Sequence, residues 1–138
     1  MPLNKMEIDI SSDPMEMGQV EDFIKEIFVR YSISMEIYFK VMVCVNEAVT
    51  NSIMHGNKYN NNKLVKIQSY SCHKYLYFRI IDQGEGFDFH CLPDPTDIEN
   101  LKKETGRGIY IIRTISDETA FREKGNIIEF KIDLCGED

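Results

Sequence analysis

The chain reads Glu47-Ala48-Val49-Thr50-Asn51, later Asp82-Gln83-Gly84-Glu85-Gly86 and then Gly106-Arg107-Gly108, and these three stretches decide its fold. Each stretch alone is a weak pattern. Their order predicts that a helix carries the first, that a strand ends just before the second, and that the third is a glycine turn that opens another helix. Together they predict a pocket with walls from all three.

The apolar pattern around these stretches predicts the remaining elements. Apolar residues alternate where strands are expected and recur at helical spacing where helices are expected. Strands are expected at residues 7–10, 64–71, 75–81, 119–122 and 127–134, and helices at residues 14–31, 34–55 and 108–115. Helices on one face of a mostly antiparallel sheet form a two-layer sandwich, so this order predicts the α+β fold class.

Two of the predicted helices have capping residues. Asp13 can cap the first helix, and Glu16 would complete a capping box with it. Ser34 can cap the second helix, although residues 38–45 within it are rich in β-branched and aromatic residues and could pass for a strand. Length favours the helix, because no break occurs before Gly56.

Glu47, Asn51 and His55 would share one face of this second helix, since they are spaced at i, i+4 and i+8. The amide oxygen of Asn51 is a suitable ligand for Mg²⁺, which keeps several waters and bridges phosphates. The Glu47 carboxylate could take a proton from an attacking hydroxyl or water, and His55 could reach a phosphate oxygen. Without the other stretches, the ordinary interpretation of Glu47 and Asn51 is a solvated helix face.

Asp82 follows an apolar strand and precedes a glycine turn. Its carboxylate could accept a hydrogen bond from an exocyclic amine, such as that of adenine. Gly84 and Gly86 allow the backbone to approach a ligand and to adopt positive φ. Taken in isolation, the same stretch fits a strand-to-loop turn with a capping aspartate.

The third stretch, Gly106-Arg107-Gly108, precedes the helix expected at residues 108–115. Unpaired N–H groups at a helix N-terminus bind phosphate with help from the helix dipole, and Arg107 could add a charge-assisted contact. The stretch is not a Walker A loop, since no Gly-Lys-Ser/Thr follows it.

Composition narrows the class of protein. The length of 138 residues predicts a single domain, 1–138, with its core at about residues 7–134. The net charge of −7 disfavours nonspecific binding to nucleic acid. The sequence contains no apolar signal core and no run long enough to span a membrane. Its four scattered cysteines lack metal-ligand spacing, which favours reduced thiols in the cytoplasm over zinc or a redox pair.

Taken together, the stretches resemble the motifs of the Bergerat-fold (GHKL, or histidine kinase-like) ATPase superfamily, which includes gyrase, histidine-kinase catalytic domains and bacterial anti-sigma factor serine kinases. Residues 47–56 are similar to its N box, residues 82–88 to its first glycine box and residues 106–112 to its second. Within the superfamily the chain is most similar to the anti-sigma factor serine/threonine kinases. Its small size and the sequence Glu-Ala-Val-Thr-Asn in the N box favour that group.

The resemblance implies specific roles for residues of the three stretches. Asp82 would bind the adenine amine, Asn51 would hold Mg²⁺ and Glu47 would be the general base. Residues that would shape the pocket or lie near the phosphates are Gly84, Gly86, Gly106, Gly108, Arg107 and His55. The resemblance also implies ATP and Mg²⁺ as cofactors, phosphorylation of a serine on an anti-anti-sigma protein, sequestration of a sigma factor, and a homodimer.

Two other functions remain open at this point. One is a nucleotide-switched binding module that never transfers phosphate, and the other is a detached catalytic domain that phosphorylates histidine on a separate protein. Residues 87–105 are predicted to form a lid, because so long a polar loop in a compact domain usually has a function. Lys102 and Lys103 could reach phosphates from this lid, and the alternative for them is a solvated charge pair.

Overall fold

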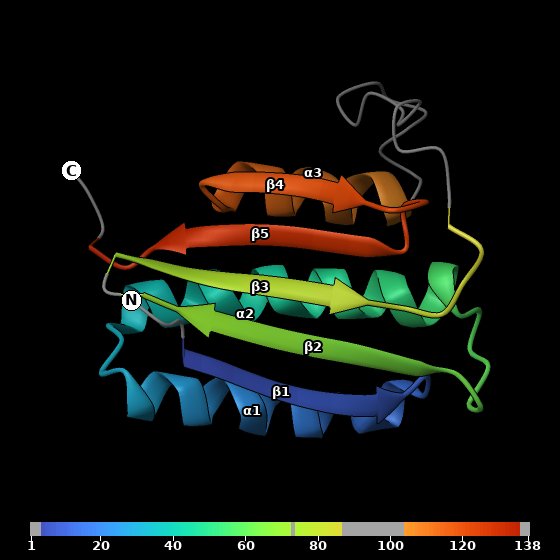
Figure 1. The fold of residues 1–138 in the computed structure, drawn as a ribbon, viewed down its shortest axis with the longest axis horizontal. Helices are drawn as coiled ribbons and strands as arrows, with labels where there is room; N and C mark the ends of the chain where they lie inside the picture. The colour runs from blue at the N-terminus through green and yellow to red at the C-terminus, as the bar shows by residue number, and fades with distance from the viewer. Residues whose placement is uncertain (1–3, 73, 87–103, 136–138) are drawn as a thin grey trace.

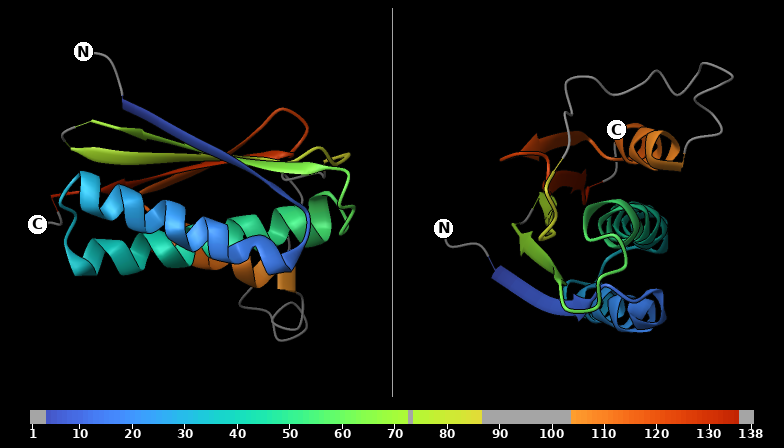
Figure 2. Two further views of the ribbon diagram at one scale, coloured as in Figure 1. Left: turned by 90° about the horizontal axis from the view of Figure 1, so that it is seen from below. Right: turned by 90° about the vertical axis from the view of Figure 1, so that its right-hand side faces the viewer.

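The computed structural model describes residues 4–72, 74–86 and 104–135, and of residues 104–107 it describes the backbone alone. These residues form two layers, a β-sheet and a row of helices against one of its faces (Figures 1 and 2). The α+β two-layer fold predicted from the sequence is therefore confirmed. Nearly all of the predicted lid, including Lys102 and Lys103, lies outside the described residues.

The sheet contains five antiparallel strands in the order β1-β2-β3-β5-β4. The strands are β1 (Asn4–Ser11), β2 (Leu64–Ser71), β3 (Tyr75–Ile81), β4 (Glu118–Arg122) and β5 (Ile127–Asp133). All of the predicted strands are present. β3 pairs with β5, its neighbour in space but not in sequence, so this pair joins the two halves of the chain (Figure 1).

Three α-helices form the second layer. They are α1 (Met17–Arg30), α2 (Met35–Asn51) and α3 (Glu104–Ile115). A short 3-10 turn, η1 (Pro14–Glu16), precedes α1, and a π-helical turn, η2 (Ser52–Gly56), follows α2. Figure 2 shows the three helices on the same side of the sheet. Among the residues that the structure describes, no helix is long and apolar enough to cross a membrane.

The core lies between the two layers. Leu76, Phe78 and Ile80 alternate along β3 toward the helices, and each is at most 1% exposed. Phe78 stacks on Phe130 of β5 with their ring centroids 5.4 Å apart. Val45 of α2 packs into the same cluster from the helix side. The alternating apolar side chains of the strands and the apolar stripe of the helix therefore pack together in one layer.

The predicted helix caps are confirmed in part. The Asp13 side chain accepts a backbone hydrogen bond at 2.9 Å and caps η1, and the Ser34 hydroxyl caps α2 with a hydrogen bond at 3.3 Å. The predicted capping box is wrong, because Glu16 Oε1 accepts a hydrogen bond from the Ser11 N–H at 3.0 Å. Since Glu16 ends η1, its carboxylate reaches back to the end of β1.

The long second helix is confirmed, but its last turn is wider than predicted. The α-helix ends at Asn51, and in η2 the Asn57 N–H donates a hydrogen bond to the Ser52 carbonyl at 2.8 Å. A π turn of this kind is rare in helices and is found frequently at functional sites. Here it brings Gly56 against the side chain of Asp82.

The start of α3 corrects the prediction for the third stretch. The sequence predicted Gly106-Arg107-Gly108 as a turn in front of a helix, whereas α3 already begins at Glu104. Glycine lowers helix propensity by about 1 kcal/mol relative to alanine, which is why the pattern placed the start too late. The tight packing of Gly108 against α2 explains why a glycine is present inside the helix.

Candidate functional site

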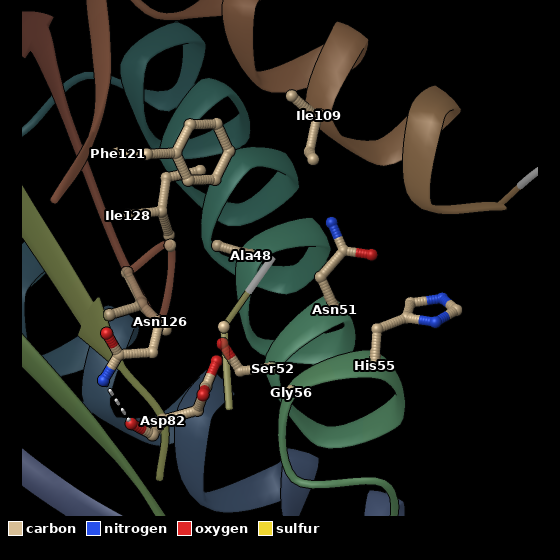
Figure 3. A pocket seen from close by; sticks show the side chains of 13 residues that line it. Ala48, Asn51, Ser52, His55, Gly56, Asp82, Ile109, Phe121, Asn126 and Ile128 are labelled. Carbon is tan, nitrogen blue, oxygen red and sulfur yellow. Dashed lines mark hydrogen bonds between the residues drawn. The ribbon is translucent and has the colours of Figure 1, made fainter. Parts of the chain in front are cut away.

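A cavity of about 230 Å³ lies between the end of α2, the end of β3, α3 and the turn that joins β4 to β5 (Figure 3). Its apolar lining comes from Ala48, Ile80, Ile109, Phe121 and Ile128. Its polar lining comes from Asn51, Ser52, His55, Asp82 and Asn126. A slot with apolar walls and a few polar groups at one end is the usual form of a small-molecule site.

Asp82 provides the carboxylate at the polar end of this cavity. It is only 8% exposed, and its Oδ1 accepts a hydrogen bond from the Gly84 N–H at 2.8 Å. Burial raises the pKa of Asp82, because the low-dielectric surroundings disfavour the charged carboxylate. Hydrogen bonds from Gly84 and Ser52, together with the positive charges of Lys124 and Lys63, oppose that rise.

The backbone of Asp82 is fixed by the turn between β4 and β5. The Asp82 N–H donates to the Asn126 carbonyl at 2.9 Å, and Asn126 Nδ2 donates to the Asp82 carbonyl at 3.1 Å (Figure 3). Asn126 Oδ1 is buried and accepts no hydrogen bond from any residue that the structure describes. Asn126 belongs to none of the three stretches, and only the pairing of β3 with β5 brings its turn to Asp82.

Gly56 at the end of η2, and the two glycines of the first glycine stretch, are required by close contacts. A Cβ on Gly56 would overlap the Asp82 carboxylate, and a Cβ on Gly84 would overlap the Gly56 carbonyl. Gly86 adopts a φ of 85° against the Lys124 carbonyl, which confirms its predicted positive φ. The same prediction for Gly84 is wrong, since Gly86 and Gly125 are the positive-φ glycines in the described chain. Gly84 is needed instead for its close approach to Gly56.

Glu47 and Asn51 meet the third stretch across the contact between α2 and α3. A Cβ on Gly108 would lie 2.9 Å from Glu47 Oε1 and 3.1 Å from Asn51 Nδ2. Asn51 lines the cavity and His55 lies at its exposed rim, one turn further along (Figure 3). Glu47 lies beside Asn51 and outside the cavity lining. The structure therefore brings Glu47 and Asn51 of the first stretch against Gly108 of the third.

Gly106 and Arg107 lie in the first turn of α3. The N–H groups of a first helical turn have no partner within the helix, so these two positions keep the predicted capacity to bind an anion through the backbone. Gly108 is the fifth residue of the helix and lies beyond that turn. Its contact with Glu47 and Asn51 gives it a packing role instead.

A second cavity of about 290 Å³ adjoins the first and shares His55, Gly56 and Gly86 with it. Its remaining lining includes Lys58 and Lys63. The first cavity is smaller than the ~300–1,000 Å³ of pockets for drug-sized ligands. A ligand that fills it with a flat ring could therefore extend into open space at this rim.

Within the residues that the structure describes, no group of three or more His, Cys, Asp and Glu side chains could hold a metal ion. Asn51 offers one amide oxygen at the cavity. A magnesium ion held there would need oxygens from a bound anion and from water, as magnesium sites in nucleotide enzymes commonly have.

Residues 10–132 match the model of the histidine kinase-like ATPase domain. The chain belongs to this family. The resemblance predicted from the three stretches is therefore confirmed at the level of the superfamily.

Individual relatives point to one branch of that family. The chain is 30% identical over 91 residues to the serine-protein kinase RsbW of Staphylococcus aureus strain MSSA476, and equally to that of strain JH9. Each match covers 60% of this chain and 57% of the relative. The chain thus spans less than two thirds of the length of these relatives, and their names describe protein kinases that act on serine.

Proposed function

We propose that the cavity binds ATP and that the Asp82 carboxylate accepts a hydrogen bond from the exocyclic amine of adenine. The observation that supports this most is the nearly complete burial of a carboxylate at the end of an apolar slot. A buried carboxylate with a raised pKa is costly, and such groups cluster at functional sites. The family of the chain, a histidine kinase-like ATPase domain, supports the same ligand.

The polar atoms at the end of the slot favour adenine over purines that carry an oxygen in place of the amine. Asp82 and the unpaired Oδ1 of Asn126 are both hydrogen-bond acceptors at the lining of the cavity. A donor such as an amine satisfies them, whereas a purine carbonyl would place another acceptor beside them. Ile109 and Ile128 line the flanking walls, which suit the flat faces of a base.

The phosphates are proposed to lie toward Asn51 and the first turn of α3. Asn51 would hold Mg²⁺ through its amide oxygen, and His55 and Arg107 would be near the phosphates, as the family resemblance implies. Bound Mg²⁺ bridges phosphate oxygens and neutralises the charge that develops during phosphoryl transfer. The first-turn N–H groups of Gly106 and Arg107 can add backbone contacts to an anion.

Glu47 is proposed as the general base of a serine/threonine protein kinase. It lies one helical turn before Asn51, and both contact the same face of Gly108, so a carboxylate and a metal-binding amide point to one region. The serine-protein kinases of S. aureus support this activity. By family resemblance, the substrate is a serine or threonine of an anti-anti-sigma protein. The same chain, as a homodimer, is proposed to sequester a sigma factor.

Glu47→Gln separates the kinase from a module that only binds nucleotide. The variant is expected to keep the ATP affinity of the wild type in calorimetric titration and to lose transfer of labelled phosphate to a candidate anti-anti-sigma protein. Glu36→Gln is the matched control, because Glu36 is an exposed residue in the first turn of the same helix. That control is expected to keep both properties.

The possible outcomes decide between the functions. Transfer by Glu47→Gln at the wild-type rate would show that Glu47 is not the base. Binding of ATP without any transfer by the wild type would favour the nucleotide-switched module. A phosphorylated product that is labile to acid would identify phosphohistidine and support the detached histidine-kinase catalytic domain.

A further inference from the structure

Asn57, the residue directly after η2, is the centre of a buried network that adjoins the cavity. It is 1% exposed, although it lies at the start of the loop that joins η2 to β2. Its side chain forms hydrogen bonds with three segments: the link after β1 and the first glycine stretch, which are distant in sequence, and the start of β2. No sequence motif drew attention to this residue.

The hydrogen bonds use both donors and the acceptor of the amide. Asn57 Nδ2 donates to Ser12 Oγ at 2.8 Å and to the Leu64 carbonyl at 3.0 Å. Asn57 Oδ1 accepts a hydrogen bond from the Gln83 N–H at 2.8 Å. Because one side has two donors and the other an acceptor, the orientation of the amide is fixed by its partners.

Two further hydrogen bonds close the network around Asn57. Ser12 Oγ donates to the Lys63 carbonyl at 2.7 Å. The Leu64 N–H donates to Gln83 Oε1 at 2.6 Å, so Gln83 is held through both its backbone and its side chain. The loop from Asn57 to Leu64 and the first glycine stretch therefore form one connected unit.

This unit controls the place of Asp82. Gln83 is the residue between Asp82 and Gly84, and Gly56 is the residue before Asn57. Gly56 already touches the Asp82 carboxylate on one side and Gly84 on the other, with no room for a Cβ. A shift of Asn57 would move both sides of that contact.

We propose that Asn57 is a positioning residue for purine recognition, because its buried amide fixes the first glycine stretch against η2 and so sets the place of the Asp82 carboxylate. The inference rests on the proposed binding of ATP and adds a residue that acts through Asp82 without touching the ligand. A purely structural asparagine would stabilise the fold and leave the choice of purine unchanged.

The first test needs no nucleotide. Amide hydrogen exchange is measured by NMR for wild type and for Asn57→Ala, with Asn61→Ala as the matched control in the same loop, where Asn61 is exposed. Exchange of the Gln83 amide is expected to become at least tenfold faster in Asn57→Ala, while the Phe78 amide of β3 keeps its protection. Unchanged exchange at Gln83 would overturn the proposal.

The second test measures purine selectivity. Calorimetric titration gives Kd for ATP and for inosine triphosphate, which carries an oxygen in place of the adenine amine. In Asn57→Ala the preference for ATP is expected to fall at least fivefold, whereas Asn61→Ala keeps the wild-type preference. An unchanged preference in folded Asn57→Ala would reduce Asn57 to a structural role and overturn the proposal.

The two tests keep the two proposals apart. Failure of the wild type to bind ATP would refute the proposed function, and the exchange of Gln83 would still decide whether Asn57 fixes the stretch. Should Asn57→Ala fail to fold, Ser12→Ala removes one partner of the amide and keeps Asn57 itself. Ser12→Ala is then expected to give a smaller increase in the exchange of the Gln83 amide and a smaller fall in the preference for ATP. The absence of both changes would overturn the proposal.

Discussion

Gly56→Ala is the substitution whose effect follows most directly from the structure. The added methyl group would overlap Asp82 Oδ2 and lie about as close to Cγ and Oδ1, so the carboxylate or η2 must move. The φ of Gly56 is not positive, so the effect comes from the contact alone. Overfilling a packed site of this kind costs about 1–3 kcal/mol of unfolding free energy.

Movement of the Asp82 carboxylate would also break its hydrogen bond with Gly84. When the carboxylate turns away, the buried N–H of Gly84 loses its acceptor at 2.8 Å, and an unsatisfied buried donor costs about 1–3 kcal/mol. We therefore expect Gly56→Ala to lower the free energy of unfolding by about 2–6 kcal/mol. Nucleotide affinity should fall at least tenfold, because Asp82 leaves its place.

Urea unfolding followed by circular dichroism measures the stability, and calorimetry measures the affinity. Gly18→Ala is the matched control, because nothing lies within 4 Å of a Cβ at Gly18 in the exposed part of α1. It should leave affinity unchanged and raise stability by about 0.5–1 kcal/mol. The double variant Gly56→Ala/Asp82→Ala should recover stability relative to the sum of the single changes. Additive effects in this cycle would refute the contact as the cause.

Three further outcomes are expected. Asp82→Asn should raise the unfolding free energy at pH 7, because it removes a buried charge whose pKa is raised by burial, and should abolish ATP binding. Because the pKa of Asp82 is raised in the folded state, the stability that this group contributes to the wild type is greatest below pH 3.8 and is lost as the pH rises through the pKa of the folded state. Urea unfolding at a series of pH values should show that Asp82→Asn lacks this dependence. Hydrogen bonds from Lys66, Gln68 and Lys5 lower the pKa of Glu7 to about 2. The contribution of Glu7 to the unfolding free energy is therefore present above pH 4.5 and is lost as the pH falls through about 2. Glu7→Gln should remove this dependence on acid, which NMR titration and acid unfolding can follow. Phe78→Ala should cost about 3–5 kcal/mol in urea unfolding, because it removes a side chain that is 1% exposed, and an effect below 1 kcal/mol would contradict the packing described for the core.

The strands and most of α2 could be predicted because the residue patterns that specify them lie within each element. β3 has the bounds that its alternation predicted, and the ambiguous run at residues 38–45 was resolved by length. The cavity-lining residues Asp82, Asn51 and Gly86 were also predicted from short patterns, because the three stretches, each weak alone, occur together in an order that indicates a pocket.

The rest depends on contacts between segments that are distant in sequence. The π turn η2 and the early start of α3 were missed, because propensity places a helix end near glycine. In the structure, Gly56 and Gly108 are instead required by Asp82 and Glu47, respectively. Asn126 and Asn57 were missed for the same reason, since no spacing in the sequence shows that either lies beside the first glycine stretch.

The pairing of Asp82 with Asn126 affects the protein while it is still being made. A growing chain that has left the ribosome as far as β3 contains the N box and the first glycine box, yet it lacks the turn that fixes the backbone of Asp82. At that stage β3 also lacks β5 as its neighbour, and the cavity lacks the two walls that α3 and the turn between β4 and β5 provide. If the cavity binds nucleotide as proposed, a chain that lacks the hairpin of β4 and β5 is therefore expected not to hold it, so that binding would report that this hairpin has formed.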